Sequence, residues 1–347
     1  MMSDNKSNDH SEELDFVTKP TFQQSVRKAK RRQTIKFFII GSLSTLLILY
    51  ALYLGASYAL QKRIINDNDE QILSEIKGAN VYRSGDKSFT YGFLNATSQV
   101  WIEKTIGDRT IIWNTIKEQI PALGSKKVID NPRSVESSGF SDKLNRFVHY
   151  NSFNGEREVE FYYPHVKYDY LPNELEIATN LDENTLAEVA LSFDKPYTLK
   201  ELEELMGSED VNWLWVNTEA QVEKQEMDWS DANDTQKELI ETTDPRKNIY
   251  GNRTMSGASA NGFQVKDEGF IQHAQYFLYA IEDLSKEGKY QSEAQEIANG
   301  IKKNSFPTVD DIRIIGAVVT GTPEELERFT DLGIMRASTI GATTSLY

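Results

Sequence analysis

The segment 37–60, which reads FFIIGSLSTLLILYALYLGASYAL, runs for 24 residues without a charged side chain. At about 1.5 Å of rise per residue, a helix of this length extends roughly 36 Å and can cross a hydrocarbon core of about 30 Å. Backbone amide and carbonyl groups cannot stay unpaired in lipid, so we expect one continuous helix. The segment therefore predicts a chain that a membrane divides into residues 1–36 and 61–347.

The basic residues around this segment predict its orientation. Six lysines and arginines lie between residues 27 and 36, and only Lys62 and Arg63 follow closely on the other side. Loops that are rich in Lys and Arg tend to remain in the cytoplasm. We expect a single-pass protein of the cell membrane, with its N-terminus in the cytoplasm and its C-terminal domain outside.

A cleaved signal peptide is the competing interpretation, because Ser57-Tyr58-Ala59 has a small-x-small cleavage pattern. The apolar core of a secretory signal usually spans about 7–15 residues. The present segment is longer, and 36 residues precede it. These features favour an uncleaved anchor.

Small residues also recur within this segment. Ala51, Gly55 and Ala59 are spaced by four, so a helix would carry them on one face. Another helix could approach such a face closely. The alternative is that small residues are simply common in spanning helices.

Composition restricts what residues 61–347 can bind. They contain 30 basic and 48 acidic residues, a net charge of −18. So acidic a domain argues against nucleic acid or anionic lipid as its ligand. The chain has no cysteine, which excludes disulfides, thiolate catalysis and cysteine-based zinc sites.

The part before the apolar segment is basic and contains a pattern typical of a helix start. Thr21 would be the N-cap, with Gln24 three residues further on. Phe22, Val26 and Ala29 then share one face. This short helix could dock a cytoplasmic protein, or it could lie against anionic headgroups.

The remaining pattern predicts an α+β fold. Alternating or β-branched runs predict strands at 98–106, 110–116, 156–163, 186–193, 211–216, 311–320 and 334–342. Helices are expected at 269–286 and 290–303, and after the capping-box residues Thr198 and Thr322. A turn is expected at 194–196 and a long loop at 225–262. Residues 61–80 read as a stalk or as the start of the folded domain.

No catalytic motif is present. The four histidines, His10, His149, His165 and His273, lack the spacing of a metal site, and no nucleophile elbow or phosphate loop occurs. Trp213 and Trp215 would share one strand face, which is more often core than binding groove. We therefore expect no enzyme activity, cofactor or metal.

Several stretches resemble the sigma factor regulator family, which comprises bacterial transmembrane anti-sigma proteins that restrain extracytoplasmic-function sigma factors. The most specific are AEVALSFDKPYT at 187–198, IGAVVTGT at 315–322 and RASTIGA at 336–342. The Trp213/Trp215 strand also fits, and the basic tail with the apolar segment is similar to the family's N-terminal region. The resemblance covers most of residues 22–110 and 180–347.

The resemblance implies that the cytoplasmic tail sequesters an extracytoplasmic-function sigma factor while the outer domain responds to the envelope. Many anti-sigma factors use a zinc-containing His/Cys domain, but this tail has neither the cysteines nor the length. It must therefore bind by a short helix. Whether the membrane or a second membrane protein helps is left open. Phe22 and Val26 are the expected apolar contacts, and Arg27, Lys28 and Arg31 are expected to supply charge complementarity.

The sequence thus predicts a single-pass membrane protein with one transmembrane α-helix and an α+β extracytoplasmic domain. Its segments are a basic cytoplasmic tail with a short helix (1–36), the transmembrane helix (37–60), a strand-rich region (61–180) and a sigma-regulator-type α+β domain (181–347). Two rival hypotheses remain. One is a membrane-anchored binding module for wall polymer or peptide, and the other is an anchored hydrolase in which His149 or His165 meets a carboxylate.

Overall fold

The computed structural model describes residues 20–130, 137–141, 143–144, 146–166, 168, 170–218, 254–265 and 269–347. By its internal contacts the chain divides into two units, Met1–Ala59 and Leu60–Tyr347. The regions 61–180 and 181–347 both belong to the second unit, and the boundary between them stays a prediction.

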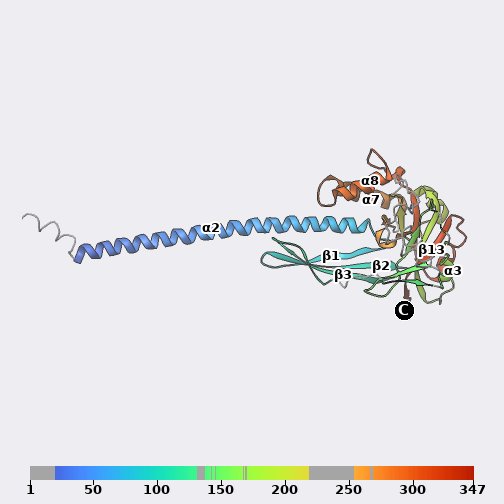
Figure 1. The fold of residues 1–347 in the computed structure, drawn as a ribbon, viewed down its shortest axis with the longest axis horizontal. Coiled ribbons are helices and arrows are strands. Elements are labelled where there is room, and N and C mark those ends of the chain that lie inside the picture. Colours follow the sequence, from blue (N-terminus) through green and yellow to red (C-terminus); the bar gives the residue numbers. More distant parts are fainter. Residues whose placement is uncertain are drawn as a thin grey trace, which may run out of the picture. The chain divides into compact units, whose positions relative to one another are not determined.

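One helix, α2, runs without interruption over Pro20–Glu75 (Figure 1). Among the described residues it is the one helix long and apolar enough to cross a membrane. The predicted N-cap at Thr21 is wrong: Thr21 lies inside the first turn, where its carbonyl accepts a hydrogen bond from Ser25 Oγ at 2.9 Å. The expected short tail helix is part of α2, because no proline occurs between Pro20 and Pro121 to end it.

An antiparallel five-stranded sheet is the centre of the second unit, in the order β11-β9-β12-β8-β13. Its strands are β8 (Thr185–Tyr197), β9 (Val211–Val216), β11 (Gly262–Gln264), β12 (Ile314–Gly321) and β13 (Met335–Ser345). Every residue of β12 is buried, because both faces of the sheet are covered.

Helices cover one face of this sheet. They are α4 (Leu199–Met206), α7 (Phe270–Lys286), α8 (Gln291–Ile301) and α9 (Pro323–Glu327), and their apolar residues join the larger core cluster (Figure 1). The capping boxes predicted at Thr198 and Thr322 are both present. The short helix α3 (Leu175–Ala178) and a 3-10 turn, η3 (Val309–Asp311), complete this part.

Aromatic side chains cover the other face. Trp213 and Trp215 point there together, as expected, and pack against Phe161 at ring-centroid distances of 5.8 and 4.8 Å. Phe161 belongs to β7 (Glu160–Tyr162), which pairs with β10 (Thr254–Ser256). A 3-10 turn, η2 (Gly257–Ser259), follows β10, and β5 (Ser137–Ser141) pairs separately with β6 (Arg146–Tyr150).

A second antiparallel sheet has the order β1-β2-β3-β4. Its strands are β1 (Tyr82–Tyr91), β2 (Asn95–Ile106), β3 (Arg109–Pro121) and β4 (Lys127–Asp130). The β2–β3 turn packs on the central sheet, where the Gly107 amide donates to Thr320 Oγ1 at 2.8 Å. The opposite end of this sheet carries the β1–β2 and β3–β4 turns.

Three expectations need correction. The predicted turn at 194–196 is wrong, because these residues lie inside β8. The pairing of β8 with β12 is irregular there, between Ser192 and Tyr197. The strand expected at 156–163 is only Glu160–Tyr162. The loop expected at 225–262 is wrong for 254–262, which contain β10 and η2, while 225–253 lie outside the described residues.

Candidate functional site

The C-terminal end of α2 enters the core of the second unit. Leu73 and Ile76 are buried there at 8% and 3% exposure, so residues 61–80 begin the folded domain. The backbone beyond the helix is then hydrogen-bonded to the residues at the two ends of η2. Gly78 N donates to Ala260 O at 2.9 Å and Ala79 N donates to Gly257 O at 2.8 Å. We call residues 76–80 the junction.

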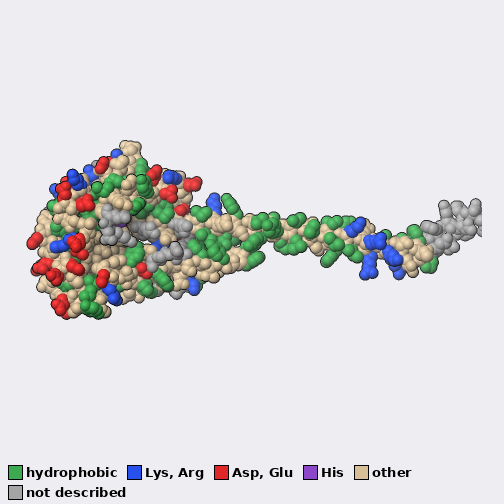
Figure 2. Space-filling model, turned by 180° about the vertical axis from the view of Figure 1, so that it is seen from behind, with side chains coloured by type: hydrophobic (Ala, Val, Ile, Leu, Met, Phe, Trp, Pro, Cys, Tyr) green, Lys and Arg blue, Asp and Glu red, His purple; other side chains and the backbone are tan. Residues whose placement is uncertain are grey.

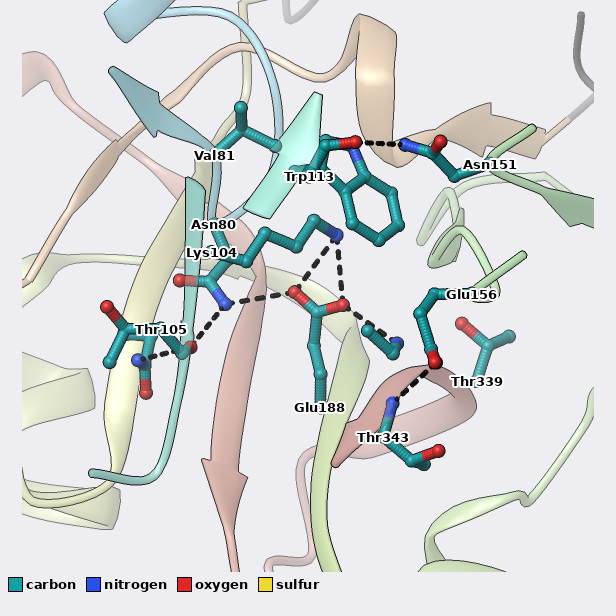
Figure 3. Close-up of polar contacts among 12 residues, drawn as sticks. Asn80, Val81, Lys104, Thr105, Trp113, Asn151, Glu156, Glu188, Thr339 and Thr343 are labelled. Carbon is teal, nitrogen blue, oxygen red and sulfur yellow. Dashed lines mark hydrogen bonds and ion pairs between the residues drawn. The ribbon is translucent and has the colours of Figure 1, made fainter. Parts of the chain in front are cut away.

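Asn80 ends the junction with its side chain fully buried. Its backbone is left-handed, with a φ of 54°, a conformation that asparagine tolerates better than most residues. Asn80 Nδ2 donates to the Thr105 carbonyl and to Glu188 Oε1, both at 2.9 Å (Figure 3). One side chain thus ties the end of α2 to β2 and to β8.

A buried ion pair lies directly beyond Asn80. Lys104 Nζ of β2 donates to both carboxylate oxygens of Glu188 in β8, at 3.1 and 2.9 Å (Figure 3). Neither side chain has any exposed area. Burying two charges is unfavourable unless geometry and further hydrogen bonds compensate. The compensation is present, because Lys104 Nζ also lies 3.9 Å from the centroid of the Trp113 ring.

The C-terminal strand completes the site. The Ala342 amide of β13 donates to Glu188 Oε2 at 3.1 Å. Its neighbour Gly341 leaves room for this contact, because a Cβ there would lie 2.3 Å from Glu188 Oε2 and 2.5 Å from a methyl group of Val159. The Glu188 carboxylate is therefore held by the junction, β2 and β13 together.

A second buried cluster joins β6, β7 and β13. Arg146 Nη2 donates to Glu174 Oε2 at 3.0 Å, and Arg146 Nη1 donates to Glu160 Oε2 at 3.4 Å. Burial raises the pKa of the Glu160 carboxyl, although hydrogen bonding by Thr254 and the charge of Arg146 oppose this. The Ile340 amide donates to Glu174 Oε2 at 2.9 Å, so this cluster also fixes β13.

These two clusters have the properties of structural links. Their charged groups are paired and enclosed, and so they hold separate elements in one register. Breaking either pair would leave a buried charge without its partner, which is strongly unfavourable. Separating the elements that each cluster joins would therefore cost much free energy.

A surface cavity of about 870 Å³ opens next to the junction. Lys77, Asn261 and Glu293 contribute polar atoms to its wall. Lys77 Nζ and Glu293 Oε1 form an ion pair there at 2.8 Å. A polar molecule in this cavity would contact Lys77, the junction residue that follows the buried Ile76.

The predicted partner-binding residues do not share one face. All five are exposed on α2, and Phe22 and Val26 are each 36% exposed. At about 100° per residue, Arg27, Lys28 and Arg31 are centred about 170° around the helix from Phe22 and Val26. The structure therefore presents an apolar stripe and a basic stripe on opposite sides.

Apart from His149, which lies near Glu160 of the second cluster, the remaining sequence candidates are separate from these clusters. Ala51, Gly55 and Ala59 lie on α2, and a Cβ at Gly55 would meet nothing within 4 Å. His149 is half-buried in β6. His165 is exposed with its ring 5.7 Å from that of Tyr163. In the described part of the chain, no group of three or more metal-binding side chains is arranged around a common point.

The sequence reasoning missed Asn80, Lys104 and Glu188. A signal was available for Glu188, which is the single charge inside the apolar run LAEVALSF, but not for Lys104, which lies beside Glu103 in IEKTI. Such positions require a partner when the strand is buried on both faces. Their pairing across 84 residues was not readable from local pattern.

Comparison with known proteins identifies the C-terminal part. Residues 179–342 match the family model described as sigma factor regulator C-terminal. Searches of curated proteins and of solved structures find no match. The match covers α4, α7, α8, α9, four strands of the central sheet and β13 as far as Ala342, and it includes Glu188 and Gly341. The C-terminal domain of this chain, residues 179–342, belongs to the sigma factor regulator family.

Proposed function

We propose that this protein is a membrane-anchored anti-sigma factor. Family membership implies a regulatory role with a sigma factor as partner. In the proposal, residues 1–36 lie in the cytoplasm and hold an extracytoplasmic-function sigma factor. Residues 37–60 cross the membrane once, and residues 61–347 lie outside and respond to the state of the envelope.

The observation that carries this proposal is the continuity of α2. One helix begins in the basic segment, includes the whole uncharged run and ends at the junction of a sigma factor regulator domain. A helix has all its interior backbone groups paired, as a membrane crossing requires. Leu73 in its last turn and Ile76 directly after it are packed into the domain core, so the domain is attached to the end of the helix.

The opposite stripes on the tail suggest how a partner binds. A flat surface cannot contact Phe22, Val26 and the basic stripe at the same time. A groove that holds the apolar stripe would leave Arg27, Lys28 and Arg31 at its rim, where they can meet acidic residues or anionic headgroups. Sequestration needs only that this complex covers the surface by which the sigma factor binds polymerase or promoter.

The test is a reporter driven by the candidate sigma factor in cells that carry the full chain. We expect repression by the wild-type protein, and loss of repression when residues 1–36 are removed or scrambled at constant charge. Membrane fractionation confirms that each variant is still anchored. Continued repression by the scrambled variant would refute the proposal and favour an anchored binding module.

A further inference from the structure

The outer end of the β1–β4 sheet exposes three large apolar side chains. Tyr91 is 67% exposed, Phe93 is 80% exposed and Leu123 is 77% exposed. Tyr91 ends β1, and Phe93 and Leu123 lie in the β1–β2 and β3–β4 turns. These turns are neighbours, because Ala122 N donates to Leu94 O at 2.8 Å. We call residues 91–95 and 121–127 the foot. A cluster of exposed apolar residues in one place indicates a contact surface.

The foot lies beside the start of the second unit's part of α2. Arg63 Nη1 donates to the carbonyls of Pro121 and Gly124, at 2.9 and 2.5 Å. Lys126 Nζ lies 3.2 Å from Glu70 Oε2, about two turns further along the helix than Arg63. The other end of the same sheet is held at the junction, where Asn80 binds Thr105. The sheet therefore runs alongside α2 from Arg63 to the junction.

This position corresponds to the end of the uncharged run. Arg63 is three residues beyond Leu60, a rise of about 4.5 Å along a helix. Leu60 itself is only 8% exposed, whereas Leu52 is 64% exposed. Leu60, the last residue of the run that would lie in lipid, is thus buried in the second unit.

The chemistry of the foot matches a lipid headgroup region. Aromatic rings with one polar edge, such as tyrosine, collect at this depth of a bilayer. Residues 91–95 and 121–127 contain two lysines and no acidic residue, in a domain whose net charge is −18. Lys126 is paired with Glu70 and Glu118, and the exposed Lys127 adds a positive charge to the foot. Figure 2 shows hydrophobic side chains gathered on this end of the domain.

We propose that the foot rests in the membrane interface. Tyr91, Phe93 and Leu123 are then inserted among the headgroups of the leaflet that faces the domain. The β1–β4 sheet then forms a second contact with the membrane besides α2. Because β2 has 12 residues at about 3.3 Å each, the sheet is a strut of roughly 40 Å between the lipid surface and the junction. This inference rests on the proposed crossing by residues 37–60.

The absence of cysteine makes the test direct. Single cysteines are introduced by Phe93→Cys and Leu123→Cys in the full chain, which is reconstituted into vesicles of phosphatidylcholine and phosphatidylglycerol. Each cysteine carries a nitroxide label, and its collisions with oxygen and with a water-soluble nickel chelate are measured. Ile177→Cys is the matched control, because Ile177 is 43% exposed on α3, away from the foot. Leu47→Cys reports on the crossing itself.

We expect frequent oxygen collisions and a loss of nickel collisions at positions 93 and 123, relative to position 177. Nickel collisions at 93 and 123 as frequent as at 177 would overturn the inference. So would low collision rates with both reagents, since that result means that a protein surface covers the foot. If position 47 were also open to nickel, the proposed crossing would fail. If position 47 is immersed in lipid while positions 93 and 123 are open to nickel, only the inference about the foot is refuted.

Discussion

Lys104 and Glu188 form an ion pair from which solvent is excluded, and the same carboxylate accepts a hydrogen bond from the residue that ends the helix junction. Three parts of the domain therefore depend on one carboxylate group: β2, β13 and the junction that follows α2. A change at this carboxylate is expected to act on stability and on the attachment of the helix together.

Replacing Lys104 alone should be severe. Lys104→Met leaves Glu188 buried without its counter-charge, and we expect a loss of about 3–5 kcal/mol in the free energy of unfolding. The double variant Lys104→Met with Glu188→Gln should recover much of this loss, because no buried charge remains. Denaturant unfolding of the purified protein in detergent measures both.

The matched control is Lys77→Met, which breaks the partly exposed pair with Glu293 and should change stability by about 1 kcal/mol or less. Equal effects of the two lysine substitutions would contradict the role of burial.

Asn80 makes two contributions that substitutions can separate. Asn80→Gly keeps the left-handed backbone accessible but removes the hydrogen bonds to Thr105 and Glu188. We expect this to lower the free energy of unfolding by about 1–3 kcal/mol. Asn80→Ala should lose about 1 kcal/mol more, because alanine disfavours a φ of 54°. Thermal unfolding compares them. Asn304→Ala, at an exposed residue with a φ of 68°, should show the backbone effect alone.

The apolar stripe of the tail should dominate partner affinity. Phe22→Ala and Val26→Ala are each expected to weaken binding of the sigma factor by about 1–2 kcal/mol, roughly 5- to 30-fold. Calorimetry with the full chain in detergent measures this. Gln24→Ala, on the opposite side of α2, is the control. Neutralising Arg27, Lys28 and Arg31 should chiefly reduce the dependence of affinity on salt.

Asp311 gives the domain an acid-sensitive contact. A hydrogen bond from Lys302 and another from the Thr308 amide lower the pKa of its carboxyl to about 2. The folded-state pKa lies below the ordinary value of 3.8, so this stabilisation is present above 3.8 and is lost as the pH falls towards 2. Melting temperatures over this range should fall less steeply for Asp311→Asn. The neighbouring Asp310→Asn should retain the wild-type slope.

Glu160 should have the opposite pH dependence. Burial raises its pKa, so the folded state binds a proton more readily than the unfolded chain does. Its stabilising contribution is then present at low pH and is lost as the pH rises through the raised pKa. The melting temperature of Glu160→Gln relative to wild type should therefore increase as the pH rises. Glu176→Gln, at an exposed carboxylate of α3, should show no such trend.

Local signals in the sequence predicted local structure well. The capping boxes at Thr198 and Thr322 and the paired faces of Trp213 and Trp215 need only neighbouring residues, and all are confirmed. β8 is different. Asp194-Lys195-Pro196 has the composition of a turn, but it lies inside β8, between Phe193, which pairs with β13, and Tyr197, which pairs with β12. Tertiary hydrogen bonding outweighed local preference.

The candidate site shows the same division. The apolar run and the basic tail are continuous in sequence and were predicted as such. The junction depends on residues from β2, β8 and β13 that no local pattern brings together. The sequence predicted the shared face of Phe22 and Val26, and the structure adds that Arg27, Lys28 and Arg31 are centred on the opposite side of α2.

Gly341 sets a limit on how the junction can be altered. Its φ is not left-handed, so the restriction is one of space: the volume that any side chain would occupy holds the Glu188 carboxylate and a methyl group of Val159. A methyl group at position 341 and a carboxylate at position 188 exclude each other. A redesigned version of this domain would have to exchange both positions at once, together with Lys104, or keep all three.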